Sequence, residues 1–364
     1  MTPVDRIYLQ RACELAERGR GSTSPNPSVG AVLALGARTL GEGFHRMRGE
    51  PHAEAEALRD ASARGYDVRG ATAYVTLEPC DHQGLTPPCT RALIDAGVAR
   101  VVVGALDPNP RTASAGVARL RDAGVPVDVV DDAWSRELIE DFSHYVARTR
   151  PFVRLKLATS LDGFVAERPG TRRWLTGPQS REYVRDLRAT HDAVMVGAGT
   201  VRVDDPQLTV RPPRARRRPY VRVVACEDTP IPLDRAVLAP VDGYAPTIVL
   251  APGGKREAFT ALECAADVIY VGESERLDLA GALDALRAHG IASVLCEGGP
   301  TLAARLLEAG LVDRVDWLVA PILLGGPEAL PALARSQAAT PLRFERVREL
   351  GSDVLLSCTK CSAD

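Results

Sequence analysis

An imidazole and two thiols stand at intervals that suit a metal ion. His52 follows Pro51 at the expected start of a helix, and Cys80 and Cys89 each follow a proline. One nitrogen and two thiolates fill three of the four tetrahedral positions of zinc and leave the fourth open for water, which is typical of a catalytic site. Glu54, two residues after His52, can take a proton from that water and return it to a leaving group. The spacing therefore predicts a hydrolytic zinc site with His52, Cys80 and Cys89 as ligands and Glu54 as the catalytic residue.

Zinc nucleobase deaminases carry the same residues in the same order, as His-x-Glu followed by Pro-Cys-x-x-Cys. The present chain has eight residues between its two cysteines rather than two, and this polar loop, residues 81–88, could contact a substrate. Taken singly, the histidine is more simply a helix cap and each cysteine a small core residue. The conjunction of the four residues favours a deaminase site over these structural roles.

The elements that must position this site alternate between helix and strand. Periodicity predicts helices at 6–16, 52–63, 90–96 and 115–123, and strands at 29–33, 73–77, 101–103 and 125–130. Such alternation is typical of a layered α/β domain. After a helical connector at 134–148, the sequence Thr149-Arg150-Pro151 marks a boundary. We therefore expect a first domain at 1–149 and a second at 150–364.

The second domain is also expected to be α/β, with less chemistry visible in its spacing. Strands are predicted at 152–157, 193–197 and 293–296, and a helix at 179–188. The last strand runs into Glu297-Gly298-Gly299-Pro300-Thr301 and a helix, where backbone amides and the helix dipole could hold a phosphate. A tight strand-to-helix turn explains these glycines at least as well. No Gly-x-Gly-x-x-Gly follows an expected strand, which disfavours a standard dinucleotide-binding fold.

Composition excludes several classes of protein. Of the 364 residues, 45% are hydrophobic and 25% charged, as in ordinary globular proteins. A net charge of −2 gives no field to attract nucleic acid, and the arginines at 214 and 216–218 stand among prolines that predict a solvated loop. No run approaches the roughly 18 apolar residues of a membrane span, and the charged start does not resemble a secretory signal. We therefore expect a cytoplasmic protein that binds neither nucleic acid nor membrane.

The eight cysteines do not predict a disulfide scaffold in a chain of this length without a signal peptide. Cys13, Cys226, Cys264 and Cys296 are expected in the core. Cys358 and Cys361 form a lone Cys-x-x-Cys, which has too few ligands for a structural zinc and is expected in a frayed tail.

The segments around the metal residues resemble the bifunctional pyrimidine deaminase/reductase family of riboflavin biosynthesis. The similar segments are TSPNPSVGAV (23–32), GEGFH (41–45), HAE (52–54), EPCDHQGLTPPC (78–89) and DPNP (107–110). The resemblance implies a cytidine-deaminase-like fold for the first domain and the same zinc ligands and proton shuttle as above. It also implies that Asn26, His45 and His82 lie near the pyrimidine or its sugar phosphate.

The second half resembles the reductase domain of the same family, which has a dihydrofolate-reductase-like fold and uses NADPH. The similar segments are LKLATSLDG (155–163), WLT (174–176), LR (187–188), residues 196–211, EGGPTL (297–302) and residues 320–326. A homo-oligomer formed through the reductase domains is also implied. The resemblance implies NADPH contacts at Ala158, Trp174, Thr200, Asp204, Gly298, Gly299, Pro300 and Thr301, and substrate contacts at Lys156, Arg188, Leu208, Arg211 and Glu297.

The chain departs from the family pattern at positions that would contact phosphate or substrate. Leu85 stands where the family has Arg or Lys, and residues 111–116 replace a glycine-rich continuation, although Arg111 could supply the lost cation. Before Trp174 the family has Gly-Glu-Ser or Gly-Asp-Ser, whereas this chain has Arg172, which could contact phosphate as a further substrate-binding residue or exclude the usual ligand.

The expected function is therefore bifunctional. The first domain would deaminate 2,5-diamino-6-ribosylamino-4(3H)-pyrimidinone 5′-phosphate, and the second would use NADPH to reduce the ribosyl group to ribityl. One alternative is a paralogue that acts on a related pyrimidine in a specialised pathway, with only the deaminase active. Others are a nucleic-acid deaminase, which the near-neutral charge disfavours, and a non-catalytic pyrimidine or nucleotide sensor, which the intact zinc set disfavours for the first domain only.

Overall fold

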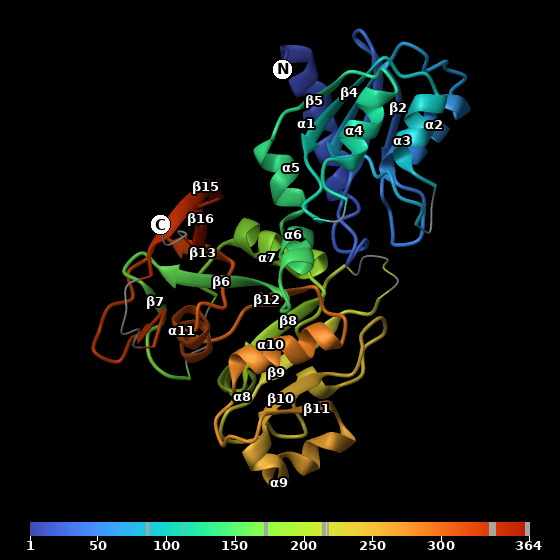
Figure 1. Ribbon diagram of the computed structural model, residues 1–364. Helices are drawn as coiled ribbons and strands as arrows, with labels where there is room; N and C mark the ends of the chain where they lie inside the picture. Colours follow the sequence, from blue (N-terminus) through green and yellow to red (C-terminus); the bar gives the residue numbers. More distant parts are fainter. Residues whose placement is uncertain are drawn as a thin grey trace. The chain divides into compact units, whose positions relative to one another are not determined.

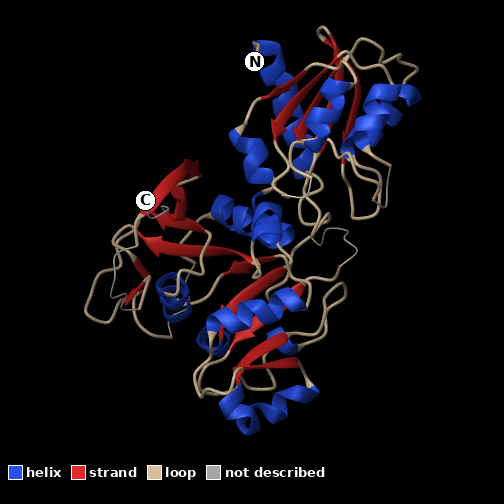
Figure 2. Ribbon diagram, viewed as in Figure 1, coloured by secondary structure: helices blue, strands red, loops and turns tan. Residues whose placement is uncertain are grey.

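The computed structural model describes residues 1–84, 87–110, 112–170, 174–212, 216, 218–334 and 340–360. The chain forms two compact units, of which one comprises Met1–Arg148 and the other begins at Thr149 (Figure 1). Each unit is built on its own β-sheet with helices packed against it (Figure 2). Within the described residues, no helix is both long enough and apolar enough to cross a membrane.

The sheet of the first unit has five strands in the order β2-β1-β3-β4-β5. β1 pairs antiparallel with β2 and β3, whereas β3, β4 and β5 run parallel. The strands are β1 (Gly30–Leu35), β2 (Arg38–Phe44), β3 (Thr72–Leu77), β4 (Arg100–Ala105) and β5 (Val127–Val129). The helices are α1 (Pro3–Glu17), α2 (Ala53–Ala63), α3 (Cys89–Asp95), α4 (Ala115–Asp122), α5 (Ala133–Leu138) and α6 (Glu140–Ala147).

Apolar side chains alternate across these strands and bury a helix layer on each face. On one face α2, α3 and α4 pack through Ala57, Leu93 and Leu120 against Val75 and Val101. On the other face α1 and α5 pack against the same strands. The metal residues all lie on the α2 and α3 side, at the start of these helices or just after β3.

Two elements differ from the sequence expectation. β2 is not predicted, because Gly41 and Gly43 interrupt its apolar pattern. A Cβ at Gly43 would lie 2.4 Å from the carbonyl oxygen of Ala53, so glycine is what lets α2 pack directly on β2. The expected connector helix at 134–148 is divided into α5 and α6 at Ile139, whose φ of −117° leaves the helical region while its side chain is buried.

The second unit contains a nine-stranded sheet in the order β11-β10-β9-β8-β12-β6-β13-β16-β15. In this sheet order, all strands from β11 through β10, β9, β8, β12 and β6 to β13 pair parallel with their neighbours. β16 pairs antiparallel with β13, and β15 pairs antiparallel with β16. The strands are β6 (Phe152–Ser160), β8 (Ala193–Gly197), β9 (Val221–Ala225), β10 (Ile248–Pro252), β11 (Asp267–Val271), β12 (Ser293–Cys296), β13 (Arg314–Ala320), β15 (Leu342–Leu350) and β16 (Asp353–Lys360), while β7 (Phe164–Ala166) pairs with β14 (Leu330–Pro331). The helices are α7 (Pro178–Thr190), α8 (Ala198–Asp204), α9 (Arg256–Phe259), α10 (Leu279–Ala288) and α11 (Pro300–Glu308), with short 3-10 turns at Ala236–Leu238, Gly253–Lys255 and Thr260–Cys264.

The burial of the cysteines agrees with the sequence expectation at some positions and contradicts it at others. Cys13, Cys226 and Cys296 are buried, as expected. The expectation for Cys264 is wrong, because this residue is exposed at the end of a 3-10 turn. The expectation for Cys358 is also wrong, because β16 continues to Lys360 and places Cys358 in the core opposite Val315. Cys361 lies outside the described residues.

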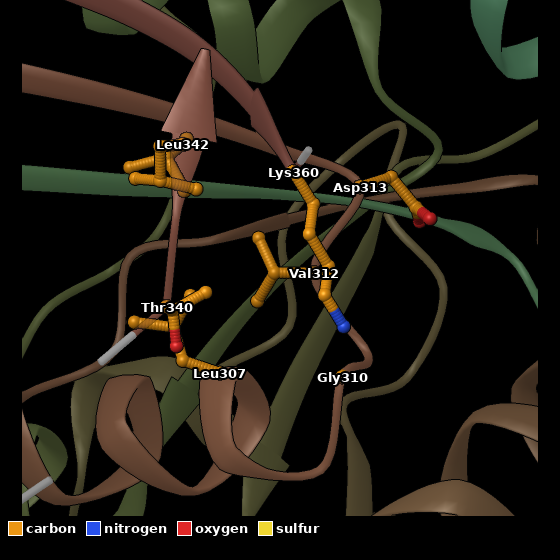
Figure 3. A pocket seen from close by; sticks show the side chains of 8 residues that line it. Leu307, Gly310, Val312, Asp313, Thr340, Leu342 and Lys360 are labelled. Atoms are coloured by element: carbon orange, nitrogen blue, oxygen red, sulfur yellow. The ribbon is translucent and has the colours of Figure 1, made fainter. Parts of the chain in front are cut away.

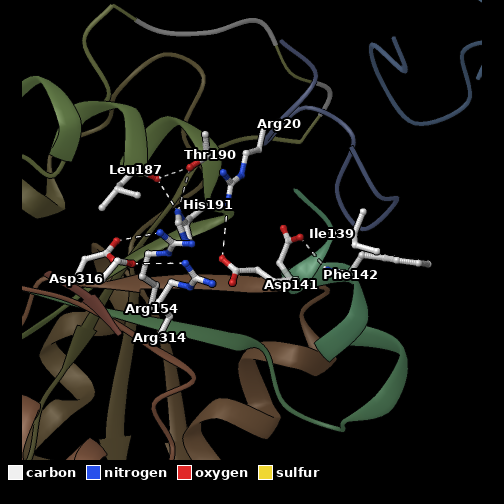
Figure 4. Close-up of polar contacts among 12 residues, drawn as sticks. Arg20, Ile139, Asp141, Phe142, Arg154, Leu187, Thr190, His191, Arg314 and Asp316 are labelled. Atoms are coloured by element: carbon white, nitrogen blue, oxygen red, sulfur yellow. Dashed lines mark hydrogen bonds and ion pairs between the residues drawn. The ribbon is translucent and has the colours of Figure 1, made fainter. Parts of the chain in front are cut away.

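Two buried carboxylates hold α7 on the sheet. Asp316 on β13 accepts hydrogen bonds from Arg154 (2.9 Å) and from the hydroxyls of Tyr183 (2.8 Å) and Ser357 (2.5 Å). Figure 4 shows Arg154 and Arg314 beside Asp316, with Leu187 of α7 nearby. At the start of the helix, Asp353 accepts from the backbone of Gly177 and the hydroxyl of Ser180. These bonds fix the helix that carries Arg188.

Replacing Asp316 with asparagine is expected to lower the free energy of unfolding of the second unit by about 3 kcal/mol. The change removes the carboxylate charge that faces the buried Arg154 at 2.9 Å, and removing one partner of a buried ion pair is costly. Native-state hydrogen exchange at β6 and β13 measures the loss. Asp234→Asn, which breaks the exposed pair with Arg235, should cost less than about 1 kcal/mol. Equal losses of unfolding free energy in the two variants would contradict a special contribution from the buried pair of Asp316 and Arg154.

The burial of Asp316 also predicts a dependence on pH. Burial alone would raise the pKa of this carboxyl, but the Arg154 charge and the hydroxyls of Ser357 and Tyr183 outweigh it and hold the pKa below its usual range. The ionised form is therefore favoured in the folded state, so its contribution is complete at neutral pH. That contribution is lost only as the pH falls through the lowered pKa of the folded protein.

A small hollow in the second unit lies between α11, the start of β13 and the β15–β16 pair (Figure 3). Its walls are largely aliphatic, with Lys360 and Asp313 beside them. None of the residues singled out from the sequence lines it. The lining residues are Leu307, Gly310, Val312, Asp313, Val315, Thr340, Leu342 and Lys360.

Candidate active sites

The structure brings the three expected metal ligands together. His52 is the residue before α2, Cys80 follows β3, and Cys89 is the first residue of α3. The Nδ1 atom of His52 lies 3.5 Å from Sγ of Cys80 and 3.4 Å from Sγ of Cys89, and all three ligand atoms lie within 4.8 Å of one another. Tetrahedral zinc with ordinary Zn–N and Zn–S bonds requires an N to S separation of about 3.6 Å. The three side chains therefore fit zinc, with His52 binding through Nδ1.

The protonation of the two thiols supports this assignment. The hydrogen bond from Cys89 is the main cause that lowers the pKa of Cys80, and the hydrogen bond from His52 lowers it further. The hydrogen bond between the two thiols and burial both raise the pKa of Cys89. One thiolate is thus favoured before any cation is present. Because thiolates are the ligand form of cysteine, the site is prepared to bind a soft or borderline metal.

Glu54 lies in the first turn of α2 with its side chain almost fully buried. Burial, and then the negative charge of the Cys80 thiolate, raise the pKa of Glu54 to about 7. The carboxyl group also makes a hydrogen bond with Cys89, which places it at the edge of the ligand cluster. A carboxylate with a pKa near neutrality is suited to both accepting and donating a proton.

Two of the expected pyrimidine-binding residues stand beside His52. The ring of His45 meets that of His52 edge to face at 5.3 Å. His45 Nδ1 donates to the carbonyl oxygen of Pro51 (3.1 Å), which leaves Nε2 to accept from the amide of Asn26 (3.3 Å). Burial lowers the pKa of His45, so the neutral ring is favoured. His82 lies in the loop after Cys80 with an exposed side chain, while Leu85 lies outside the described residues.

A second polar cluster forms in the other unit around Glu297, which follows β12. Arg188 on α7 donates two hydrogen bonds to the Glu297 carboxylate, at 2.5 and 2.9 Å. Lys156 on β6 is within reach of the same charges: burial lowers the pKa of Lys156, and Glu297 opposes that shift. The Glu297 carboxylate thus lies near two cations, one from α7 and one from the middle of β6.

The segment after α8 joins this cluster. Arg188 also donates to the carbonyl of Thr209 (3.4 Å), and Arg211 donates to the Thr209 hydroxyl (3.0 Å). Leu208 is buried and has a φ of +53°, which is uncommon for a residue with a branched side chain. The structure therefore brings Lys156, Arg188, Leu208, Arg211 and Glu297 into one region.

Tyr244 is a residue of this region that the sequence does not point to. Its hydroxyl accepts the backbone N–H of Val210 at 2.5 Å, and its ring stacks on that of Tyr220 at 5.2 Å. Tyr244 therefore holds the segment that carries Leu208 and Arg211. It stands between β9 and β10 in a stretch without periodicity, so no pattern could have indicated its role.

The expected cofactor residues do not all lie in one region, unlike the expected substrate residues. Gly299 is the residue before α11 and Pro300 the first residue of that helix. A Cβ at Gly299 would lie 3.2 Å from the Thr200 hydroxyl, so Thr200 adjoins the glycine turn. Ala158 instead packs against Leu318 and Leu355.

Trp174, another of the expected cofactor residues, is exposed. Its side chain is 77% exposed and stacks with Arg181 at 5.4 Å. No described contact joins it to the turn at Gly298 and Gly299. Arg172 lies outside the described residues.

Comparison with known proteins identifies both domains. Residues 3–105 match the cytidine and deoxycytidylate deaminase zinc-binding region, and residues 151–356 match the RibD C-terminal domain. The chain is 39% identical to the riboflavin biosynthesis protein RibD of Aquifex aeolicus, covering 97% of this chain and 98% of that protein. It is also 39% identical to RibD of Escherichia coli K12, with the same shares covered.

Solved structures show the same relationship. Acinetobacter baumannii RibD superposes with a TM-score of 0.80 at 35% identity, covering 99% of each chain. The diaminohydroxyphosphoribosylaminopyrimidine deaminase/5-amino-6-(5-phosphoribosylamino)uracil reductase of Thermotoga maritima gives a TM-score of 0.83 at 34% identity, covering 98% of this chain and 99% of that one. The expected fold class, a zinc deaminase domain followed by a dihydrofolate-reductase-like domain, is confirmed. The chain belongs to the RibD family, the bifunctional deaminase/reductases of riboflavin biosynthesis.

Proposed function

We propose that the first domain hydrolyses the ring amine of 2,5-diamino-6-ribosylamino-4(3H)-pyrimidinone 5′-phosphate and that the second, residues 150–364, reduces the ribosyl group of the product with NADPH. The observation that carries the first step is the His52, Cys80 and Cys89 cluster with Glu54 at its edge. The Thermotoga maritima relative is named for both activities. An enzyme that consumes NADPH and a phosphorylated intermediate is expected in the cytoplasm.

The deamination requires one carboxyl group that both accepts and donates a proton. Zinc, when bound, lowers the pKa of water toward neutrality and so makes hydroxide available at pH 7. Glu54 takes the proton that the water loses and delivers it to the ring amine, which leaves as ammonia. Asn26 and the neutral His45 supply a donor and a ring face beside His52, where the pyrimidine would bind, and His82 could approach from the exposed loop.

For the reduction, the protein contributes position and charge. NADPH, when bound, supplies the hydride to the opened ribose, and solvent supplies the proton. We assign a cofactor phosphate to the turn before α11, where Gly299 precedes the helix and no described side chain caps the first backbone amides. Gly298 is required there by packing, because a Cβ at that position would lie 2.7 Å from Leu302. Cofactor contacts at Ala158, Trp174, Thr200, Asp204 and residues 298–301 remain part of the proposal. Lys156, Arg188, Arg211 and Glu297, with Leu208, form the charged and shaped wall for the substrate.

Replacing Arg188 with methionine is expected to raise the KM for the reducible pyrimidine about 10²-fold, with little change in the KM for NADPH. The change removes a cation that would contact substrate and leaves Glu297 with Lys156 alone. Initial rates of NADPH oxidation measure it. Arg185→Met, on the exposed face of the same helix, is the control. A loss of ammonia release in the Arg188 variant would contradict the proposed division between the sites.

A homo-oligomer through the reductase domain is also part of the proposal. β15 is the edge strand of the nine-stranded sheet, and its residues 343–349 are exposed. Phe344 (63% exposed) lies opposite Cys358 and Val347 (60%) opposite Leu356, so both apolar side chains stand on one face. A long exposed edge with apolar side chains favours pairing with another copy. Sedimentation of the purified protein tests this assembly.

The whole proposal is tested by giving zinc-loaded protein the phosphorylated diaminopyrimidine with NADPH and following ammonia and NADPH separately. Release of ammonia with oxidation of NADPH is the expected result. Ammonia without NADPH oxidation would show that the second domain has diverged. If neither is seen although zinc is bound, the paralogue alternative, which the departures at Leu85 and Arg172 favour, replaces the proposal, and related pyrimidines become the substrates to test.

A further inference from the structure

Glu78 has a set of hydrogen bonds that the chemistry above does not use. It follows β3, precedes Cys80 by two residues, and is only 5% exposed. Its carboxylate accepts three backbone N–H groups, from Asp107 (3.1 Å), Ser114 (3.0 Å) and Val117 (3.0 Å). All three donors belong to the stretch between β4 and the first turn of α4. A single buried side chain therefore fastens both ends of that stretch.

The start of α4 depends on this carboxylate. Ser114, the residue before the helix, has a φ of +63° and makes no side-chain capping bond. The N–H of Val117 would otherwise be one of the unpaired donors of a helix start. Glu78 accepts it from a distant part of the chain and also places negative charge at the positive end of the helix dipole.

Packing locks the same stretch against the metal-ligand segment. A Cβ at Gly116 would lie 1.9 Å from the carbonyl oxygen of Pro79, so the first turn of α4 lies directly on the residue between Glu78 and Cys80. Any movement of α4 relative to Pro79 would change how the stretch stands beside Cys80. The positions of residues 106–110 and 112–114 are therefore coupled to that of the metal-ligand segment.

This stretch leaves the sheet on the side where the metal residues lie. β3 and β4 are parallel, with Leu77 opposite Ala105, so residue 106 and Cys80 both follow the carboxyl ends of these neighbouring strands. In open α/β sheets, ligands bind beyond the carboxyl ends of the strands. Within the stretch, Asp107 accepts the N–H of Asn109 (2.9 Å) and the hydroxyl of Thr112 (2.6 Å), which makes it one stiff turn. Arg111 is outside the described residues.

We propose that Glu78 is a positioning residue of the deaminase. Its carboxylate holds the described residues 106–110 and 112–114 at a fixed place beside Cys80, and Asp107 to Asn109 at the start of this stretch contact the substrate. The inference rests on the proposed deaminase function. It predicts that loosening the clamp weakens substrate binding while leaving the metal ligands and the proton shuttle in place.

The test compares Glu78→Gln with Asp5→Asn in the full-length zinc-loaded protein. Asp5 is a matched control, because it is also a buried carboxylate of the first unit with several bonds, to Thr2, Tyr74 and Arg100. Arg100 is the first residue of β4, so Asp5 acts at the amino end of this strand, away from the carboxyl end that Cys80 and residue 106 follow. Ammonia release gives KM and kcat, metal analysis gives zinc per chain, and hydrogen exchange reports the amides of Asp107, Ser114 and Val117.

Glu78→Gln is expected to raise the KM about tenfold, the equivalent of one charge-assisted hydrogen bond, with kcat within about twofold and zinc unchanged. The three amides should exchange faster than in the wild type. Asp5→Asn should leave the KM and these amides unchanged even though it lowers stability.

Three results would overturn the proposal. Unchanged exchange in Glu78→Gln would show that there is no clamp, and faster exchange with an unchanged KM would show that the stretch does not contact substrate. An equal rise of the KM in Asp5→Asn would reduce the effect to general destabilisation. If the wild type releases no ammonia, the proposed function itself fails, while exchange and direct binding of the pyrimidine still decide the role of Glu78.

Discussion

Glu54→Gln is expected to slow ammonia release by about 10³–10⁴-fold while zinc stays bound and NADPH oxidation with the deaminated substrate is unchanged. Glutamine keeps the size and the hydrogen bond of the side chain but cannot accept a proton and pass it on. The burial that raises the pKa of Glu54 also excludes bulk water, so no solvent base is placed to substitute. Measuring ammonia under saturating substrate isolates this step from binding.

Glu56 provides a control on the same helix. Its carboxylate forms ion pairs with Arg59 and Arg46 rather than with the metal residues. Glu56→Gln should therefore keep full ammonia release. Activity of Glu54→Gln within a factor of ten of the wild type would remove Glu54 from the proton transfer, and loss of zinc from that variant would reassign it as a structural support of the cluster.

Cys89→Ser is expected to reduce bound zinc from one ion per chain to near zero and to bring ammonia release down to background. The serine hydroxyl is not ionised at neutral pH, so it replaces a thiolate with a much poorer ligand. NADPH oxidation with the deaminated substrate should persist, because the second polar cluster lies in the other unit. Metal analysis after dialysis against a mild chelator measures the effect, together with both activities.

Cys13→Ser is the matched control for the zinc experiment. Cys13 is a buried thiol of the same unit and lies beside the Ser135 hydroxyl, 3.5 Å away, rather than beside His52. Its replacement should leave zinc content unchanged. If Cys89→Ser also retained a full equivalent of zinc, the ligand set inferred from the spacing and from the 3.4 Å approach to His52 would be wrong.

The deaminase half shows how far spacing alone can lead. His52, Cys80 and Cys89 occur at helix starts and strand ends, and such punctuation is visible in a sequence as prolines and a change of period. Their chemistry is equally visible, because few residue types bind zinc. Glu78 is different: its partners are backbone amides, which every residue has, so its three bonds leave no trace in the sequence.

The reductase half depends more on contacts between distant segments. Arg188 and Glu297 are both suggested by the family resemblance, but only the sheet order explains their meeting. Tyr244 has no pattern at all. The burial of Cys264 and Cys358 could not be predicted from the sequence either. Cys264 is exposed because it ends a 3-10 turn, and Cys358 is buried because β16 continues two residues beyond it.

The order of strands in the two sheets has a consequence for how the protein is made. All five strands of the first unit lie before residue 130, so its zinc-binding residues can be assembled early in translation. In the second unit β6 ends at Ser160, yet its two sheet neighbours are β12, which begins at Ser293, and β13, which begins at Arg314. Until those strands emerge from the ribosome, β6 has two unpaired edges that could pair with other nascent chains. During that interval the first unit, which precedes β6 along the chain, can already be folded.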